Sequence, residues 1–186
     1  FDLYVRLVGE AVAEYRDGPK EEGLPEAKIE LPVDGLLPHD YVPHERLRLE
    51  AYRKLAAATS DDDVAAVRAE LVDRYGEPTE QVENLLAVAR FRVRARASGV
   101  SEVSLQGRNI RFAPVELRES QELRVRRLYP GTLVKPALRT VLVPQPMTAR
   151  VGGQPLRDRA VLEWATALLD AVLPVEQPVG AGSASS

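Results

Sequence analysis

The sequence predicts a mixed α+β fold in which several helices pack around a small, mainly antiparallel sheet, with a buried C-terminal helix. Three observations lead to this prediction. Apolar residues recur at helical spacing over 44–98, in stretches separated by glycine and proline. After Gly99 apolar and polar residues alternate, as they do in strands. Residues 157–173 are apolar on nearly every side, which is typical of a largely buried helix.

The first predicted element is a helix over residues 2–15, in which every fourth residue is apolar: Leu3, Leu7, Ala11 and Tyr15. Gly18 and Pro19 are expected to end it. A short strand follows over 29–33, where apolar and polar residues alternate. Because this stretch contains Pro32, which cannot donate a ladder hydrogen bond, we expect the strand at an edge of the sheet.

Three helices come next, and they are joined by short connections. Pro43 is expected at the first helical position of a helix over 44–58. Ser60 and Asp63 have the spacing of a capping box at the start of a second helix, which runs to Tyr75. The third helix is predicted over 78–98 and is followed by Gly99.

Most strands of the sheet are predicted in the part of the chain after Gly99. A hairpin is expected around the turn at 106–109, and two further strands at 132–134 and 140–143. Between them Ser120 is expected to cap a short helix that runs to Leu128. A final helix covers 157–173. We therefore expect one domain over residues 1–173, with a lead-in helix within 1–18 and a disordered tail at 174–186, which is rich in Pro, Gly, Ala and Ser.

The composition excludes several classes of protein. Asp and Glu number 28 against 25 Lys and Arg, giving a net charge of -3, whereas dedicated nucleic-acid binders are usually strongly basic. The absence of cysteine excludes a zinc–cysteine site and a thiol nucleophile, and it fits a reducing compartment such as the cytoplasm. No apolar run approaches the ~20 residues that span a membrane. The chain begins at Phe1, within a helical pattern, so we expect it to be a piece of a longer protein.

No constellation of residues predicts catalysis. The two histidines, His39 and His44, lie in a proline-containing loop and at a helix start, without the further ligands that a metal site needs. No phosphate-binding glycine loop and no nucleophile elbow are present. We therefore expect no catalytic residue, metal or cofactor in this domain.

The densest basic run is Arg90, Arg92, Arg94 and Arg96, near the end of the third predicted helix. One interpretation is a contact with nucleic acid or with a protein partner. The other is structural: the helix begins with Glu80 and Glu83 and ends with arginines, which is the arrangement that the helix dipole favours. Residues two apart also lie on opposite sides of a helix, so the four arginines do not form one face.

A second polar cluster occurs at the end of the preceding helix. Glu70, Asp73 and Arg74 are spaced i, i+3 and i+4, so they share one face beside the buried seam. The cluster could be a local ion pair of ~0.3–0.5 kcal/mol. It could instead be a polar docking surface for a partner with complementary charges.

Several motifs, in order, resemble the C-terminal domain of the bacterial transcription-repair coupling factor. The similarity is dense over residues 1–103 and looser to about residue 144. The motifs are Leu31-Pro32-Val33-Asp34, Leu37-Pro38-His39-Asp40-Tyr41-Val42-Pro43, Arg46-Leu47-Arg48-Leu49-Glu50, Glu70-Leu71-Val72-Asp73-Arg74-Tyr75-Gly76 and Asn84-Leu85-Leu86.

The resemblance implies a regulatory role for a domain without chemistry of its own. Members of the family are DNA translocases, driven by ATP and Mg in a separate motor, that remove stalled RNA polymerase and recruit nucleotide excision repair through the damage-recognition ATPase UvrA. Their C-terminal domain restrains the protein by packing on an N-terminal domain that resembles the helicase subunit of the excision nuclease. By match to the family motif, the resemblance assigns this interdomain latch to Glu70, Asp73 and Arg74. A nucleic-acid-binding module that uses Arg90 to Arg96 is the alternative.

Overall fold

The computed structural model describes residues 27–175. The predicted lead-in helix within residues 1–18 and the part of the predicted tail beyond Val175 lie outside these residues. The described part contains a five-stranded sheet in the order β1-β2-β3-β5-β4. The pairing of β1 with β2 is parallel and the other pairings are antiparallel, which confirms the mainly antiparallel sheet. The strands are β1 Lys28–Glu30, β2 Glu102–Gln106, β3 Asn109–Ala113, β4 Leu133–Lys135 and β5 Thr140–Pro144.

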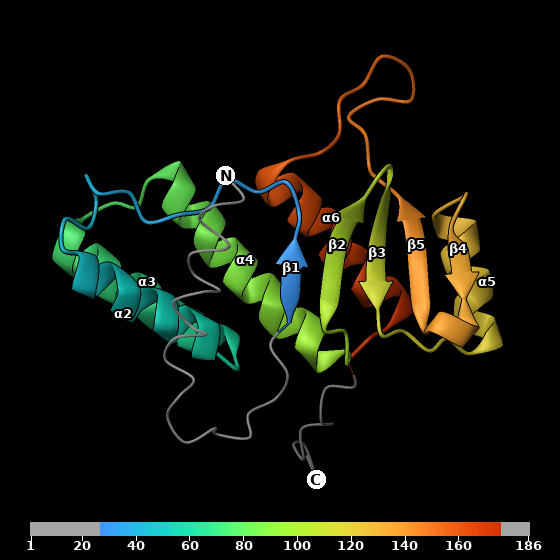
Figure 1. Cartoon of the computed structure of the whole chain (residues 1–186), viewed down its shortest axis with the longest axis horizontal. Coiled ribbons are helices and arrows are strands. Elements are labelled where there is room, and N and C mark those ends of the chain that lie inside the picture. The colour runs from blue at the N-terminus through green and yellow to red at the C-terminus, as the bar shows by residue number, and fades with distance from the viewer. Residues whose placement is uncertain (1–26, 176–186) are drawn as a thin grey trace, which may run out of the picture.

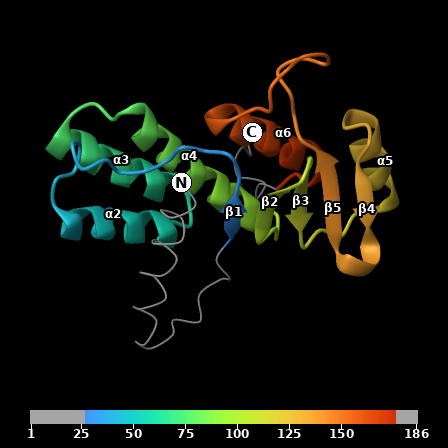
Figure 2. The same cartoon turned by 45° about the horizontal axis from the view of Figure 1, so that its top comes forward.

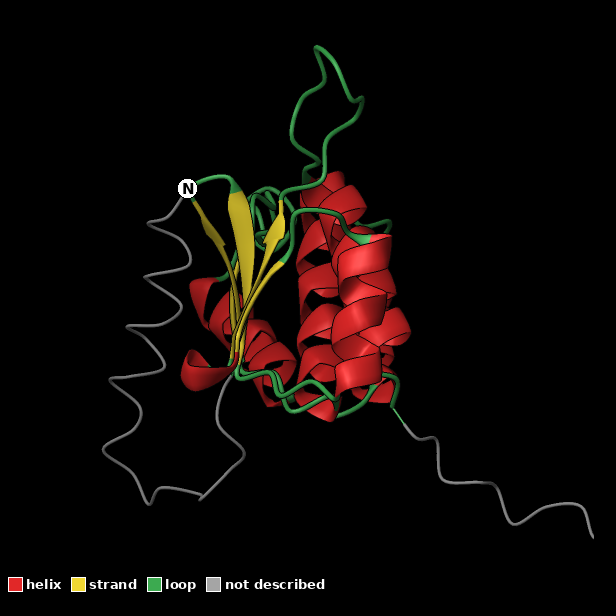
Figure 3. Ribbon diagram, turned by 90° about the vertical axis from the view of Figure 1, so that its right-hand side faces the viewer, coloured by secondary structure: helices red, strands yellow, loops and turns green. Residues whose placement is uncertain are grey.

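The helices lie mainly on one side of this sheet. They are α2 Glu45–Ala57, α3 Asp61–Tyr75, α4 Glu80–Ala97, α5 Glu119–Leu128 and α6 Asp158–Val172, with a short 3-10 helix, η2, at Pro136–Leu138. Helices α4 and α6 run side by side behind the strands in Figure 1, and the turned view in Figure 2 shows the same arrangement. Figure 3 views the sheet edge-on and shows helices stacked along one of its faces.

Within residues 27–175 the predicted element types are confirmed, and four details differ. Pro43 precedes the N-cap of α2, which is His44. Arg118, rather than Ser120, is the N-cap of α5. Strand β1 does lie at the sheet edge but ends at Glu30, because the next residues turn away: the Val33 amide donates to the Leu31 carbonyl (2.7 Å) and the Pro32 carbonyl accepts from the Asp158 amide (2.9 Å).

The fourth difference concerns α6, which is buried along one side only. Its buried residues include Val161, Leu162, Ala165 and Leu169. The opposite side, which carries Glu163, Ala167 and Asp170, is exposed. The helix is therefore a cover for one face of the sheet and not a fully enclosed core helix.

Two apolar clusters form the core, and α4 contributes to both. Val82, Leu86 and Ala89 pack into a cluster with α2 and α3. Phe91 and Ala95, from the other side of the same helix, pack into the cluster formed by the sheet and α6. At 100° per residue, the Leu86 and Phe91 directions differ by about 140°, so α4 must be apolar on two sides.

The segment between β1 and α2 joins the two clusters through polar contacts. The backbone amide of Asp34 donates to the Asp158 carboxylate (2.8 Å), at the start of α6. The Asn84 side-chain amide donates to the Asp34 carbonyl (3.1 Å), and the Gln81 amide donates to the Asp34 carboxylate (3.1 Å). One residue therefore connects the first turns of α4 to the first turn of α6.

Replacement of Gly35 should test how tightly this segment is packed. A Cβ atom at this position would lie 2.8 Å from the Leu85 amide nitrogen and 2.9 Å from the Leu85 Cα. Because both atoms belong to the backbone of α4, neither can move aside cheaply. We expect Gly35→Ala to lower the free energy of unfolding by about 1–3 kcal/mol, measured by urea denaturation. An unchanged midpoint would show that the segment can shift away from α4.

Candidate functional site: a groove between α2 and α3

The predicted cluster lies on a helix with a well-defined start. At the N-terminus of α3 the Ser60 hydroxyl accepts from the Asp63 amide (3.2 Å), as the predicted capping box requires. The Asp63 carboxylate reaches one residue further back than the motif predicts and accepts from the Thr59 amide (2.9 Å). The buried seam of Val64, Val67 and Leu71 then fixes which side of α3 faces solvent.

Glu70 and Arg74 border a groove between α3 and α2. Apolar side chains form part of its lining and charged side chains the rest. The lining residues are Leu47, Glu50, Ala51, Lys54, Val67, Glu70, Leu71, Arg74 and Tyr75. The structure thus places two of the three predicted latch residues around one concave feature, with Asp73 on the same helix next to Arg74.

Glu70 is held by cations from both helices. Its carboxylate accepts a hydrogen bond from Lys54 Nζ on α2 (2.9 Å) and lies 3.6 Å from Arg74 Nη2 on α3. Lys54 also pairs with Glu50, at 3.5 Å. The hydrogen bond from Lys54, followed by the charges of Lys54 and Arg74, lowers the pKa of Glu70 below its usual value despite partial desolvation.

Asp73 and Arg74 are more available than Glu70. Asp73 is exposed, and its carboxylate makes no hydrogen bond or ion pair with the residues that the structure describes. Arg74 keeps 53% of its side chain exposed, and its contact with Glu70 is long. The groove therefore presents the half-exposed guanidinium of Arg74 beside a partly apolar lining. Asp73 does not line the groove but adds an exposed carboxylate next to Arg74, and such available charges suit binding to a complementary surface.

Sequence reasoning did not find the contribution of α2. Lys54 and Glu50 lie on a different helix from the predicted cluster, and no spacing rule connects positions 54 and 70. The only available signal was that α2 and α3 are adjacent amphipathic helices with a short connection, which favours antiparallel packing. Over residues 27–175, no group of three or more His, Cys, Asp or Glu side chains could hold a metal ion.

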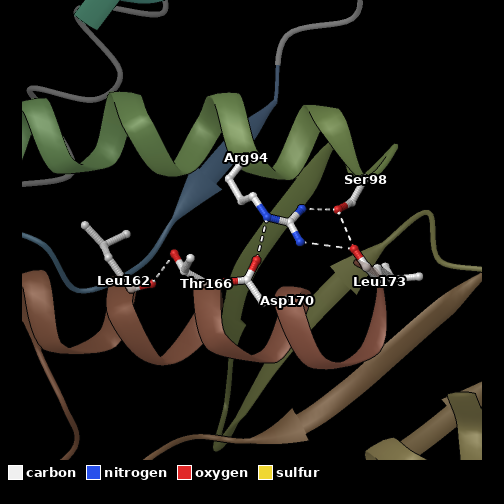
Figure 4. A network of polar contacts seen from close by, with 6 residues as sticks. All are labelled: Arg94, Ser98, Leu162, Thr166, Asp170 and Leu173. Atoms are coloured by element: carbon white, nitrogen blue, oxygen red, sulfur yellow. Dashed lines mark hydrogen bonds and ion pairs between the residues drawn. The ribbon is translucent and has the colours of Figure 1, made fainter. Parts of the chain in front are cut away.

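The arginines at positions 90, 92, 94 and 96 do not form a free basic surface, because at least three of them interact with other residues of the domain. Arg94 is 18% exposed; its Nε pairs with Asp170 (2.8 Å) and its Nη2 donates to the Leu173 carbonyl (3.1 Å). Arg94 also contacts the Ser98 hydroxyl, which itself donates to the Leu173 carbonyl (3.1 Å; Figure 4). Arg92 and Arg96 have interactions within the chain as well, and Arg90 is partly buried.

These contacts connect the C-terminal ends of α4 and α6. The last carbonyls of a helix carry partial negative charge and lack intrahelical donors. The Leu173 carbonyl, next to α6, receives two donors from α4, and the Ala171 carbonyl receives the Arg124 guanidinium from α5 (3.1 Å). Arg94 is thus a structural residue that caps α6.

Removal of Arg94 should therefore destabilise the domain. Arg94→Ala leaves the Leu173 carbonyl with one donor fewer and Asp170 without its partner, and we expect a loss of about 1–3 kcal/mol. Arg90→Ala, on the same helix, serves as the control and should change stability by less than about 0.5 kcal/mol. Equal unfolding midpoints for the two variants in urea would contradict the structural role.

The pKa of Glu70 should depend on Lys54. We expect Lys54→Met to raise the pKa of Glu70 toward its usual value, as followed by NMR titration of the side-chain carboxyl. Because the pKa of Glu70 is lower in the folded state, the ionised carboxylate stabilises the fold above the pKa of the unfolded state. This contribution is small for so exposed a pair, and it is lost as the pH falls through the folded-state pKa. Arg46→Met, which removes another cation of α2, should leave the Glu70 titration unchanged. A Glu70 titration that is the same in Lys54→Met and the parent would contradict the geometry.

No helix in residues 27–175 is long and apolar enough to cross a membrane.

The comparisons with known proteins agree with this architecture. A family model described as "TRCF domain" matches residues 31–125. The chain is 42% identical over 183 residues to the transcription-repair-coupling factor of Mycobacterium bovis, covering 92% of this chain and 15% of the relative. It is 33% identical over 111 residues to that of Staphylococcus haemolyticus, covering 59% of this chain and 10% of the relative.

A solved structure shares the fold. The crystal structure of the C-terminal domain of transcription-repair coupling factor superposes with a TM-score of 0.62 at 18% identity, covering 81% of this chain and 94% of that one. The chain spans about 15% of the length of the mycobacterial relative. From the family match and these relatives, the chain belongs to the TRCF domain family.

Proposed function

We propose that the chain is the regulatory, non-catalytic C-terminal domain of an ATP-dependent DNA translocase that removes stalled RNA polymerase and recruits nucleotide excision repair. The family membership and the names of the relatives support this assignment. The chain corresponds to a small part of those relatives. In this proposal the ATP-driven motor belongs to another part of such a longer protein.

The domain acts as an autoinhibitory latch through the face formed by Glu70, Asp73 and Arg74. Its partner is an N-terminal domain of the same protein that resembles the helicase subunit of the excision nuclease. While this contact is closed, it masks the surface that recruits UvrA and restrains the motor. The observation that carries the proposal is the groove between α2 and α3, with Arg74 half exposed at its border and Asp73 unpaired within the described part of the chain.

The chemistry of the groove suits a contact that must open. A large apolar interface would hold too firmly, whereas contacts between domains of one chain are usually modest in area and more polar. To convert the protein from almost entirely closed to almost entirely open, a partner must bind the open state more tightly than the closed state by about 5.5 kcal/mol. Lys54 contributes indirectly, because it holds the Glu70 carboxylate toward the groove.

The alternative, nucleic-acid binding by Arg90 to Arg96, has less support. Arg94 is committed to Asp170 and the Leu173 carbonyl. A phosphate would have to compete with these contacts, and displacing them would weaken the junction between α4 and α6.

The latch is tested in the full-length protein with Asp73→Lys and Arg74→Glu combined. This double variant reverses the two more available charges and keeps the Lys54–Glu70 pair. We expect basal ATP hydrolysis and the affinity for UvrA to rise at least about fivefold, while the thermal midpoint of the isolated domain stays within a few degrees.

A matched control reverses one acid and one base elsewhere. Glu163 on α6 and Arg150 are both exposed, and neither makes an ion pair in the described part of the chain. Glu163→Lys with Arg150→Glu should leave both activities unchanged. If the Asp73/Arg74 variant binds UvrA no better than the parent protein does, the latch assignment is wrong.

A further inference from the structure

The end of the molecule away from the groove has an unusual charge. Residues 118–139 contain six basic side chains and two acidic ones, a net charge of +4, although the whole chain has a net charge of -3. The bases are Arg118, Arg124, Arg126, Arg127, Lys135 and Arg139, and the acids are Glu119 and Glu122. We call residues 118–139 the basic end. It comprises α5, β4 and η2, and Figures 1 and 2 show α5 and β4 together, opposite α2 and α3.

Part of this positive charge is not neutralised within the domain. Arg126 pairs with Glu122 (2.9 Å), and Arg139 pairs with Glu116 (2.9 Å). The side chains of Arg127 and Lys135 are exposed and make no hydrogen bond or ion pair with other described residues. These two cations are available to a partner without loss of any contact that supports the fold.

The basic end also exposes leucine side chains. Eight large hydrophobic side chains of the described residues are exposed, and four of them, Leu123, Leu128, Leu133 and Leu138, lie between positions 123 and 138. Leu123 is 63% exposed and Leu138 is 67% exposed. Single exposed leucines are normal, but a concentration of them is typical of a surface that binds another molecule.

The sheet ends here as well. β4 is the last strand in the sheet order, so its outer edge has no strand partner in the described part of the chain. Its last residue, Lys135, and residues 136–139 after it are all exposed. An edge strand with free backbone groups can accept an extended segment from a partner.

From these observations we infer that the basic end is a docking surface for an acidic, leucine-bearing segment of a protein partner, which lies along β4. Carboxylates of the segment pair with Arg127 and Lys135, and its apolar side chains contact Leu123 and Leu138. This surface extends beyond residue 125, where the match to the family model ends.

The exposed leucines favour a protein over a nucleic acid. A phosphate backbone would use the cations, but it would gain little from aliphatic side chains, and the single-strand platforms that bind bases use aromatic residues. In the basic end the one aromatic residue is Tyr129, which is partly buried and packs edge-on against Trp164 (5.7 Å between ring centroids).

The inference is tested by fluorescence anisotropy with labelled peptides and the purified full chain. The probe is a short peptide that alternates Glu or Asp with Leu; the comparison peptides replace every Leu by Ser or every acid by Lys. We expect the acidic leucine peptide to bind in a salt-dependent manner, and the other two to bind at least about fivefold more weakly. Equal binding of the acidic serine peptide, or tighter binding of a short DNA duplex, would overturn the inference in favour of a general polyanion surface.

Two variants locate the site. Arg127→Glu with Lys135→Glu should weaken binding of the acidic leucine peptide at least about fivefold, and Leu123→Ser with Leu138→Ser should do the same without loss of stability. Arg46→Glu with Arg150→Glu makes the same change in net charge elsewhere, and Val151→Ser removes an apolar side chain that is 91% exposed. If these controls weaken binding as much as the site variants do, or if the site variants bind like the parent chain, the assignment to the basic end is wrong.

Discussion

Helix α4 has to satisfy two cores at once, and the arrangement of the domain depends on this requirement. Leu86 and Ala89 face the cluster with α2 and α3, whereas Phe91 and Ala95 face the sheet and α6. The helix is therefore apolar on two sides, and its remaining positions carry polar groups that connect the clusters. Gln81 and Asn84 bind Asp34 near one end of α4, and Arg94 binds the end of α6 near the other. The two clusters are consequently held in a fixed relation at both ends of one helix.

The parts of the fold that could be predicted from the sequence are those with a local signal. The three helices over 44–98 and the hairpin after Gly99 were predictable because each has a local signal in apolar spacing, caps or turn residues. The early end of β1 was not, because Pro32 is bound by Asp158, a residue far along the chain. The one-sided burial of α6 did have a local signal that the prediction overlooked, because Glu163 and Asp170, seven residues apart, lie on the same side of a helix.

In the candidate site, too, local features could be predicted and tertiary contacts could not. The i, i+4 spacing of Glu70 and Arg74 indicated that they lie together, a property local to one helix, and both border the groove, whereas Asp73 lies outside its lining. The pairing of Lys54 with the Glu70 carboxylate, like the groove itself, results from the packing of α2 against α3. Residue spacing along one helix cannot predict that packing. For the arginine run the limitation was the opposite: the charges were visible in the sequence, but their use in capping α6 depends on a tertiary contact.

The bond between Arg94 and the Leu173 carbonyl joins residues 79 positions apart, and this separation affects the order in which the chain can fold during synthesis. The cluster of α2, α3 and the first half of α4 is complete once residues up to about 89 are available. The side of α4 that carries Phe91 and Ala95 is covered only when the sheet and α6, the last helix among the described residues, have been made. A nascent chain therefore carries a finished helical subdomain with an apolar stripe still open to solvent, and such surfaces are exposed to aggregation until the final helix is made.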